Sequence, residues 1–151
     1  NVELSNLMSI IGLDLGEKAV DLNYGKIAIM ADADEDGKSI TALLLNFFSL
    51  WPDLIDNKHL YILRSPIVIA KKGKQVKRFY HYAEFVKSQK KLNGWQIDYL
   101  KGLGTLTLDE YDVMINKPIL DLVVKDKKAN DSLKIAFGKD ASLRKKWLLG
   151  K

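Results

Sequence analysis

The chain has 151 residues and a mass of 17.1 kDa, with 24 Lys and Arg against 19 Asp and Glu, a net charge of +5. This length suits one globular domain, and 47% hydrophobic with 28% charged residues excludes disordered and collagen-like classes. The absence of cysteine excludes disulfides, thiolate zinc sites and cysteine nucleophiles. No apolar run approaches the roughly 18 residues of a membrane span, so no membrane partner is expected.

The charge is divided along the chain. Residues 1–36 hold eight acids and two bases, a net of −6, whereas the remaining 115 residues hold 22 bases and 11 acids, a net of +11. An acidic front and a basic remainder indicate a polyanionic partner, with a metal ion between the two.

Apolar spacing predicts alternating helices and strands. Helices are expected at 4–11, from 40 to about 51, at 83–91, from 107 to 116, at 131–137 and at 141–149. Strands are expected at 27–31, 61–63, 67–70, 76–80 and 96–100, and residues 119–124 are expected to be extended or irregular. The run 27–31 is continuously apolar, which is typical of a strand buried on both faces. The sequence therefore predicts an α/β fold with a largely parallel sheet.

An acidic loop follows the first predicted strand. Asp32, Asp34, Glu35 and Asp36 place four carboxylates in five positions, and Gly37 is expected to turn the chain before a helix starts. The three Asp side chains can turn toward one point, where they would repel one another unless a hard cation binds. Mg²⁺ typically takes one or two carboxylates together with phosphate oxygens and water. Ligands of open α/β sheets bind beyond the carboxyl ends of strands, where this loop lies.

The acidic loop has other interpretations besides a metal site. A solvated acidic loop is the plainest alternative. An EF-hand is excluded because its twelfth position would be Leu43 instead of Glu, and because a strand precedes the loop. A phosphatase with Asp32 as nucleophile and Asp34 as acid/base stays open, although the supporting motif is absent.

Two further segments indicate phosphate contact. Five bases lie within eight residues on a predicted hairpin: Lys71, Lys72, Lys74, Lys77 and Arg78. They suit polyphosphate binding or, equally, a solvated turn. The loop Lys101-Gly102-Leu103-Gly104-Thr105 follows a predicted strand and precedes a Thr-x-x-Glu capping box, where glycines let a backbone approach phosphate. Alone, this Gly-x-Gly is a weak signal.

Three motifs in one order carry a family resemblance. They are residues 27–37, then Trp51-Pro52 followed by Pro66-Ile67-Val68, then residues 99–105. Together they resemble the TOPRIM region of type IIA DNA topoisomerases, most like the large subunit of T4-type bacteriophage enzymes or the eukaryotic enzymes. Residues 1–4 are similar to the family's Asn-x-Glu helix, and residues 132–137 and 144–148 to the connection toward its winged-helix DNA-cleavage domain. The resemblance covers nearly the whole chain.

The resemblance implies a TOPRIM domain at 1–117, Rossmann-like with a mostly parallel sheet and incomplete at its N-terminus, and a helical extension at 118–151. It also implies a Mg²⁺-dependent half-site, with two metals when complete, for cutting and rejoining duplex DNA. The metals would stabilise charge on the scissile phosphate and the leaving oxygen. The implied metal ligands are Asp32, Asp34 and Asp36. The implied DNA-backbone contacts are Lys101, Gly102, Gly104, Thr105, Lys71, Lys72 and Lys74.

The resemblance further implies partners. The family's upstream Glu-Gly-Asp-Ser glutamate, its attacking tyrosine and its ATPase domain are expected on other segments, so the isolated chain should be inactive. The expected partners are duplex DNA, the remaining large-subunit segment through whose ATPase domain ATP acts, and the subunit carrying the tyrosine. The setting would be the cytoplasm, of the host cell if the enzyme is phage-encoded. Ala31 and Ser39 stand where the family usually has Thr and His. A non-catalytic nucleic-acid or assembly module is the alternative function.

Overall fold

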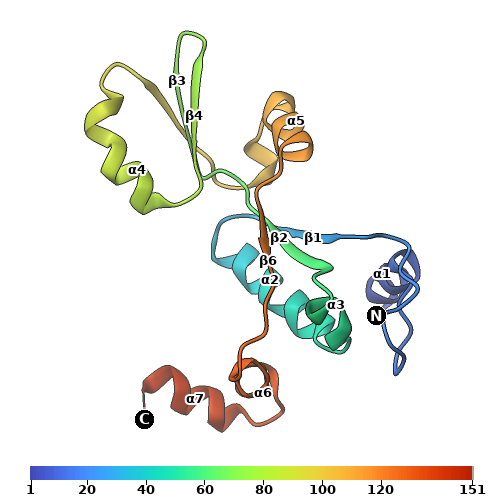
Figure 1. Cartoon of the computed structure of the whole chain (residues 1–151). Coiled ribbons are helices and arrows are strands. Elements are labelled where there is room, and N and C mark those ends of the chain that lie inside the picture. The colour runs from blue at the N-terminus through green and yellow to red at the C-terminus, as the bar shows by residue number, and fades with distance from the viewer. Residues whose placement is uncertain (151) are drawn as a thin grey trace. The chain divides into compact units, whose positions relative to one another are not determined.

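The computed structural model describes residues 1–150. Over these residues the protein has an α/β fold with two small sheets (Figure 1). Seven α-helices lie within the described residues: α1 (Val2–Ile11), α2 (Glu35–Phe48), α3 (Pro52–Asp56), α4 (Tyr82–Ser88), α5 (Leu108–Asn116), α6 (Ala129–Phe137) and α7 (Ala141–Leu149). The strands are β1 (Ile27–Met30), β2 (Leu60–Leu63), β3 (Val68–Lys72), β4 (Gln75–Phe79), β5 (Gln96–Tyr99) and β6 (Leu120–Leu122). Short 3₁₀ helices span Gln89–Leu92 and Leu103–Thr105.

The chain forms two compact units. The first unit contains residues 1–27, 43–60 and the described residues from 122 onward; the second contains residues 28–42 and 61–121. Both predicted loops, the acidic one and the glycine one, belong to the second unit. Within residues 1–150, no helix combines the length and the hydropathy that a membrane span requires.

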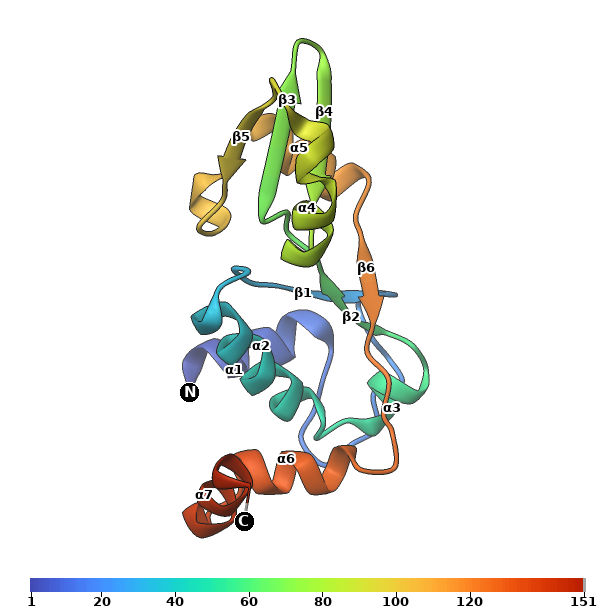
Figure 2. The same cartoon turned by 90° about the vertical axis from the view of Figure 1, so that its left-hand side faces the viewer.

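The second unit contains a sheet in the order β4-β3-β5, which is antiparallel throughout. Helix α4 lies beside this sheet (Figure 2), and Phe85 from α4 is 1% exposed in a core shared with both the sheet and the 3₁₀ helix that follows α4. The ring of Phe85 meets Phe79 edge-on at 5.5 Å and Tyr99 at 5.7 Å between centroids. Aromatic packing of this kind fixes the β3–β4 hairpin and β5 in one body.

The sheet prediction needs two corrections. A largely parallel sheet is wrong for β4-β3-β5, because β3 and β4 are joined by the tight turn at Gly73 and Lys74, and such a turn can connect only antiparallel strands. The expectation that residues 27–31 are buried on both faces is also wrong. Ile29 is buried, but Ala28 and Met30, which point to the opposite face of this four-residue strand, are exposed (Met30 to 46%), so only one face of β1 is covered.

In the first unit, the predicted bounds of α7 and the predicted end of α1 are confirmed, whereas α1 begins at Val2, two residues before its predicted start. The Asn1 side chain accepts hydrogen bonds from the first turn of α1, and Gly12 ends that helix with a left-handed φ of 85°. Trp51 is 1% exposed, and its indole N–H donates to the Asp14 carbonyl oxygen at 2.8 Å. Helix α7 begins after Asp140, whose side chain accepts a hydrogen bond from the Ser142 backbone.

Candidate metal and phosphate site

The acidic loop leaves β1 and runs directly into α2. Helix α2 begins at Glu35, so Gly37 lies in its first turn and does not precede the helix as predicted. The Asp34 carboxylate accepts a hydrogen bond from the Gly37 amide at 2.8 Å, as an N-cap residue does. A Cβ on Gly37 would lie 2.0 Å from the backbone oxygen of Asp32. The glycine is therefore required because the first turn of α2 passes directly over the backbone of the acidic loop.

The glycine loop is a tight 3₁₀ turn between β5 and α5. The Thr105 amide and hydroxyl both donate to the Gly102 carbonyl oxygen, at 3.1 and 2.7 Å. Thr107 then caps α5, because its hydroxyl accepts a hydrogen bond from the Glu110 amide at 3.4 Å. This is the hydrogen bond that the threonine side chain makes in the predicted capping box, and that half of the motif is confirmed. The loop is thus closed by its own hydrogen bonds and held at the start of a helix.

The two loops meet at Asp32. The Leu103 amide donates to Asp32 Oδ1 at 2.7 Å, although the residues are 71 positions apart in the chain. A Cβ on Gly102 would lie 2.8 Å from Asp32 Oδ2 and 2.9 Å from its Cγ. Gly102 has an extended backbone (φ 176°), which any residue can adopt. Space for the carboxylate, and not backbone conformation, therefore requires glycine at this position.

The three predicted carboxylates are not gathered at one point. Asp32 is half-buried and turns toward Leu103, Asp34 caps α2, and Asp36 is exposed. Among residues 1–150 there is no group of three or more Asp, Glu or His side chains that could hold a metal ion. The donor chemistry of Asp32 and Asp34 still fits Mg²⁺, since both are hard oxygen ligands and Mg²⁺ needs only one or two carboxylates beside phosphate and water. The metal assignment stays a prediction.

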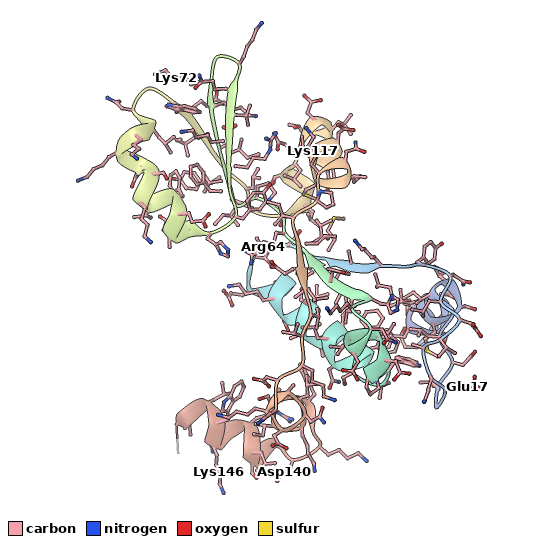
Figure 3. All side chains as sticks on the ribbon, viewed as in Figure 1. Glu17, Arg64, Lys72, Lys117, Asp140 and Lys146 are labelled. Carbon is pink, nitrogen blue, oxygen red and sulfur yellow. The ribbon has the colours of Figure 1, made fainter. Side chains whose placement is uncertain are left out.

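The hairpin lysines lie around the β3–β4 turn. Lys72, labelled in Figure 3, and Lys74 are exposed, whereas Lys71 forms an ion pair with Asp98 at 3.5 Å. Lys101 is also exposed, directly before Gly102. In the part of the chain that the structure describes, no hydrogen bond or ion pair joins these lysines to Asp32. Their role as phosphate contacts stays a prediction.

Arg78 is not part of an open basic surface. Its guanidinium donates two hydrogen bonds to Glu110, at 2.6 and 3.1 Å, and Glu110 is only 5% exposed. The side-chain hydrogen bond with Glu110 raises the pKa of Arg78, against the opposing effect of burial. The capping motif indicated Glu110, but only the fold brings Arg78 to it.

Tyr111 is a second residue that the sequence did not single out. Its hydroxyl donates to the Leu103 carbonyl oxygen at 2.8 Å, from the first turn of α5. Nothing in the sequence pattern marks it, because a Tyr on a half-buried helix face is ordinary. Its position beside Leu103 depends on the direction in which α5 leaves the glycine loop.

Residues 63–150 match the family described as the C-terminal associated domain of TOPRIM. The DNA topoisomerase small subunit of Enterobacteria phage T4 is 39% identical over 132 residues, which is 87% of this chain and 82% of that protein. The mitochondrial DNA topoisomerase 2 of Dictyostelium discoideum is 37% identical, covering 98% of this chain but 13% of its own length.

A solved structure agrees with these matches. The DNA-binding, cleavage and re-ligation domain of Plasmodium falciparum topoisomerase II superimposes with a TM-score of 0.81 at 37% identity, covering 98% of this chain and 22% of that one. The chain belongs to the type II DNA topoisomerase family and represents its TOPRIM-associated part. It is thus one part of a topoisomerase, as expected. The phage relative is a small subunit of its enzyme, whereas the sequence motifs suggested the large subunit of a T4-type enzyme or a eukaryotic enzyme.

Proposed function

We propose that this chain supplies Mg²⁺ ligands and DNA-backbone contacts to a type II DNA topoisomerase that cleaves and rejoins duplex DNA. The observation that carries the proposal is the hydrogen bond from the Leu103 amide to Asp32 at 2.7 Å, which joins the acidic loop to the glycine loop. A metal-binding carboxylate and a phosphate-binding loop must lie together if one ion is to bridge protein and DNA. Membership of the topoisomerase family supports the same conclusion.

In this proposal, Asp32 and Asp34 hold the metal, with Asp36 as a third candidate. The Oδ1 atom of each of the first two accepts a hydrogen bond from a backbone amide, that of Leu103 for Asp32 and that of Gly37 for Asp34. Bound Mg²⁺ would neutralise charge on phosphate oxygens during strand cleavage. The protein's own contribution is to fix the carboxylates before DNA arrives, because their backbone partners in the glycine loop and in α2 restrict their rotamers.

Lys101 and the hairpin lysines Lys72 and Lys74 are proposed as contacts to the DNA backbone. All three are exposed. Lys72 ends β3, Lys74 lies in the turn before β4, and Lys101 lies shortly after β5, so the sheet β4-β3-β5 holds the backbone near each of them in place. Such contacts position DNA without reading its sequence. Gly102, Gly104 and Thr105 would let the backbone of the loop approach a phosphate closely, and Lys71 would contribute less because Asp98 already pairs with it.

The remaining parts of the enzyme are proposed on the family relationship alone. They are the glutamate that completes the metal site, the attacking tyrosine, and the ATPase domain through which ATP would act, all on other segments or subunits. We also propose that β1 and β2 belong to a Rossmann-like TOPRIM domain within residues 1–117. Residues 118–151, which begin with β6 beside β2, would form its mainly helical extension. A phage origin with a cytoplasmic setting belongs to the same proposal.

Metal binding is tested with the full chain and Mg²⁺ in a calorimetric titration. Asp32→Asn and Asp34→Asn should each weaken Mg²⁺ binding by about tenfold or more, because each removes a charged oxygen ligand. Asp131→Asn, an exposed acid of α6, is the matched control and should leave binding unchanged. Equal affinity in all the variants would refute the metal assignment.

DNA contact is tested by the salt dependence of binding to a duplex in the reconstituted enzyme. Lys101→Ala should lower the slope of log K against log [salt] by about one unit, since each phosphate contact releases counterions. A cleavage assay in the same enzyme distinguishes the alternatives. Normal cleavage by Asp32→Asn would favour a non-catalytic assembly module, and release of phosphate from a generic ester by the isolated chain would favour a phosphatase.

A further inference from the structure

The backbone of Leu103 is held on both sides. Its N–H donates to Asp32 Oδ1 at 2.7 Å, and its carbonyl oxygen accepts the Tyr111 hydroxyl at 2.8 Å. The same carbonyl also accepts the Leu106 amide at 3.0 Å, which closes the 3₁₀ turn. One residue therefore connects helix α5 to the acidic loop by two hydrogen bonds that do not belong to secondary structure.

Helix α5 is held in place by an ion pair and by buried side chains. Glu110, the residue before Tyr111, is 5% exposed and accepts two hydrogen bonds from Arg78 on β4. Met114, one turn further along, is 4% exposed. The Tyr111 hydroxyl is thus presented by a helix that is anchored to the sheet β4-β3-β5 by an ion pair and by packing.

We propose that Tyr111 is a positioning residue for Asp32, acting through Leu103. The hydroxyl fixes the Leu103 peptide, and the Leu103 amide fixes Asp32 Oδ1, so the rotamer of the carboxylate that would hold Mg²⁺ is set before the ion binds. The Mg²⁺ part of this inference rests on the proposed function, whereas the coupling of Tyr111 to Asp32 rests on the two hydrogen bonds alone.

Tyr111→Phe in the full chain tests the proposal, because it removes the hydroxyl and keeps the ring. In metal-free protein, hydrogen exchange at the Leu103 amide should become about 2- to 12-fold faster, the loss expected for one hydrogen bond. The Mg²⁺ dissociation constant should rise by a similar factor. Tyr82→Phe is the matched control, since its ring is 60% exposed on α4, and it should change neither quantity.

A double-mutant cycle with Asp32→Ala separates positioning from a merely structural role. If Tyr111 acts on Asp32 through Leu103, the effects of the two substitutions on Leu103 exchange should be non-additive. Additive effects, or unchanged Leu103 exchange in Tyr111→Phe, would overturn the proposal. Failure of the metal site itself has a different signature, because Asp32→Asn would then leave Mg²⁺ affinity unchanged while the exchange readout still reports the coupling.

Discussion

Replacing Gly102 with alanine tests whether the contact of the glycine loop with Asp32 matters for stability. The new methyl group would lie 2.8 Å from one carboxylate oxygen and 2.9 Å from Cγ, closer than real Cβ atoms come. The carboxylate would have to rotate away and give up the Leu103 amide at 2.7 Å. A hydrogen bond to a charged group contributes about 1.5–3 kcal/mol. Alanine also lowers the conformational entropy of the unfolded chain, which by itself would stabilise the folded protein by about 0.4–1 kcal/mol and so offset part of that loss.

Gly104 provides the matched control in the same loop. A Cβ there meets nothing within 4 Å, and its position in the 3₁₀ turn accepts alanine, so Gly104→Ala should be neutral or slightly stabilising. The free energies of unfolding of the two variants should therefore differ by about 1.5–3 kcal/mol, or about 3–12 °C in melting temperature for a chain of this size. Urea unfolding and thermal melts measure this difference. Equal stabilities, with an unshifted Leu103 amide resonance in Gly102→Ala, would refute the reasoning.

Three further changes have defined outcomes. Glu110→Gln should lower the free energy of unfolding by about 1–3 kcal/mol, because Arg78 keeps its partial burial but loses the charge of its partner. Gly37→Ala should destabilise more than Gly102→Ala, because its Cβ would lie 2.0 Å from a backbone oxygen that cannot rotate away. Hydrogen bonds from the Ser142 side chain and backbone lower the pKa of Asp140 from its ordinary value of 3.8. The resulting stabilisation of the start of α7 should be present above that value and lost as the pH falls through the lower folded pKa.

Each of these three predictions has a control or an outcome that would contradict it. Asp109→Asn, an exposed acid on the same helix, is the control for Glu110→Gln, and equal urea midpoints would contradict the buried ion pair. A Gly37→Ala protein as stable as the native chain would contradict the close approach of α2 to the acidic loop. For α7, the Ser142 amide exchange is followed against pH, and an unchanged profile in Asp140→Asn would contradict the capping role.

Local elements were predictable because their signals come from neighbouring residues. The apolar spacing predicted α7 at its observed bounds, and the Thr-x-x-Glu pattern predicted the start of α5. The basic turn between two β-prone runs predicted the β3–β4 hairpin. The acidic loop and the glycine loop were also each located correctly, one after a strand and one before a helix.

Only the tertiary structure decided how these pieces meet. The hydrogen bond between Leu103 and Asp32 joins residues 71 positions apart, and the pairing of Arg78 with Glu110 spans 32 positions. Such contacts depend on strand order and on the path of α5, which no local periodicity encodes. For the same reason the burial of β1 was misjudged, since an apolar run has the same sequence whether one face or both faces of its strand are covered. The sequence determined which chemical groups are available, and the fold determined that Asp32, Gly102 and Tyr111 act on one another.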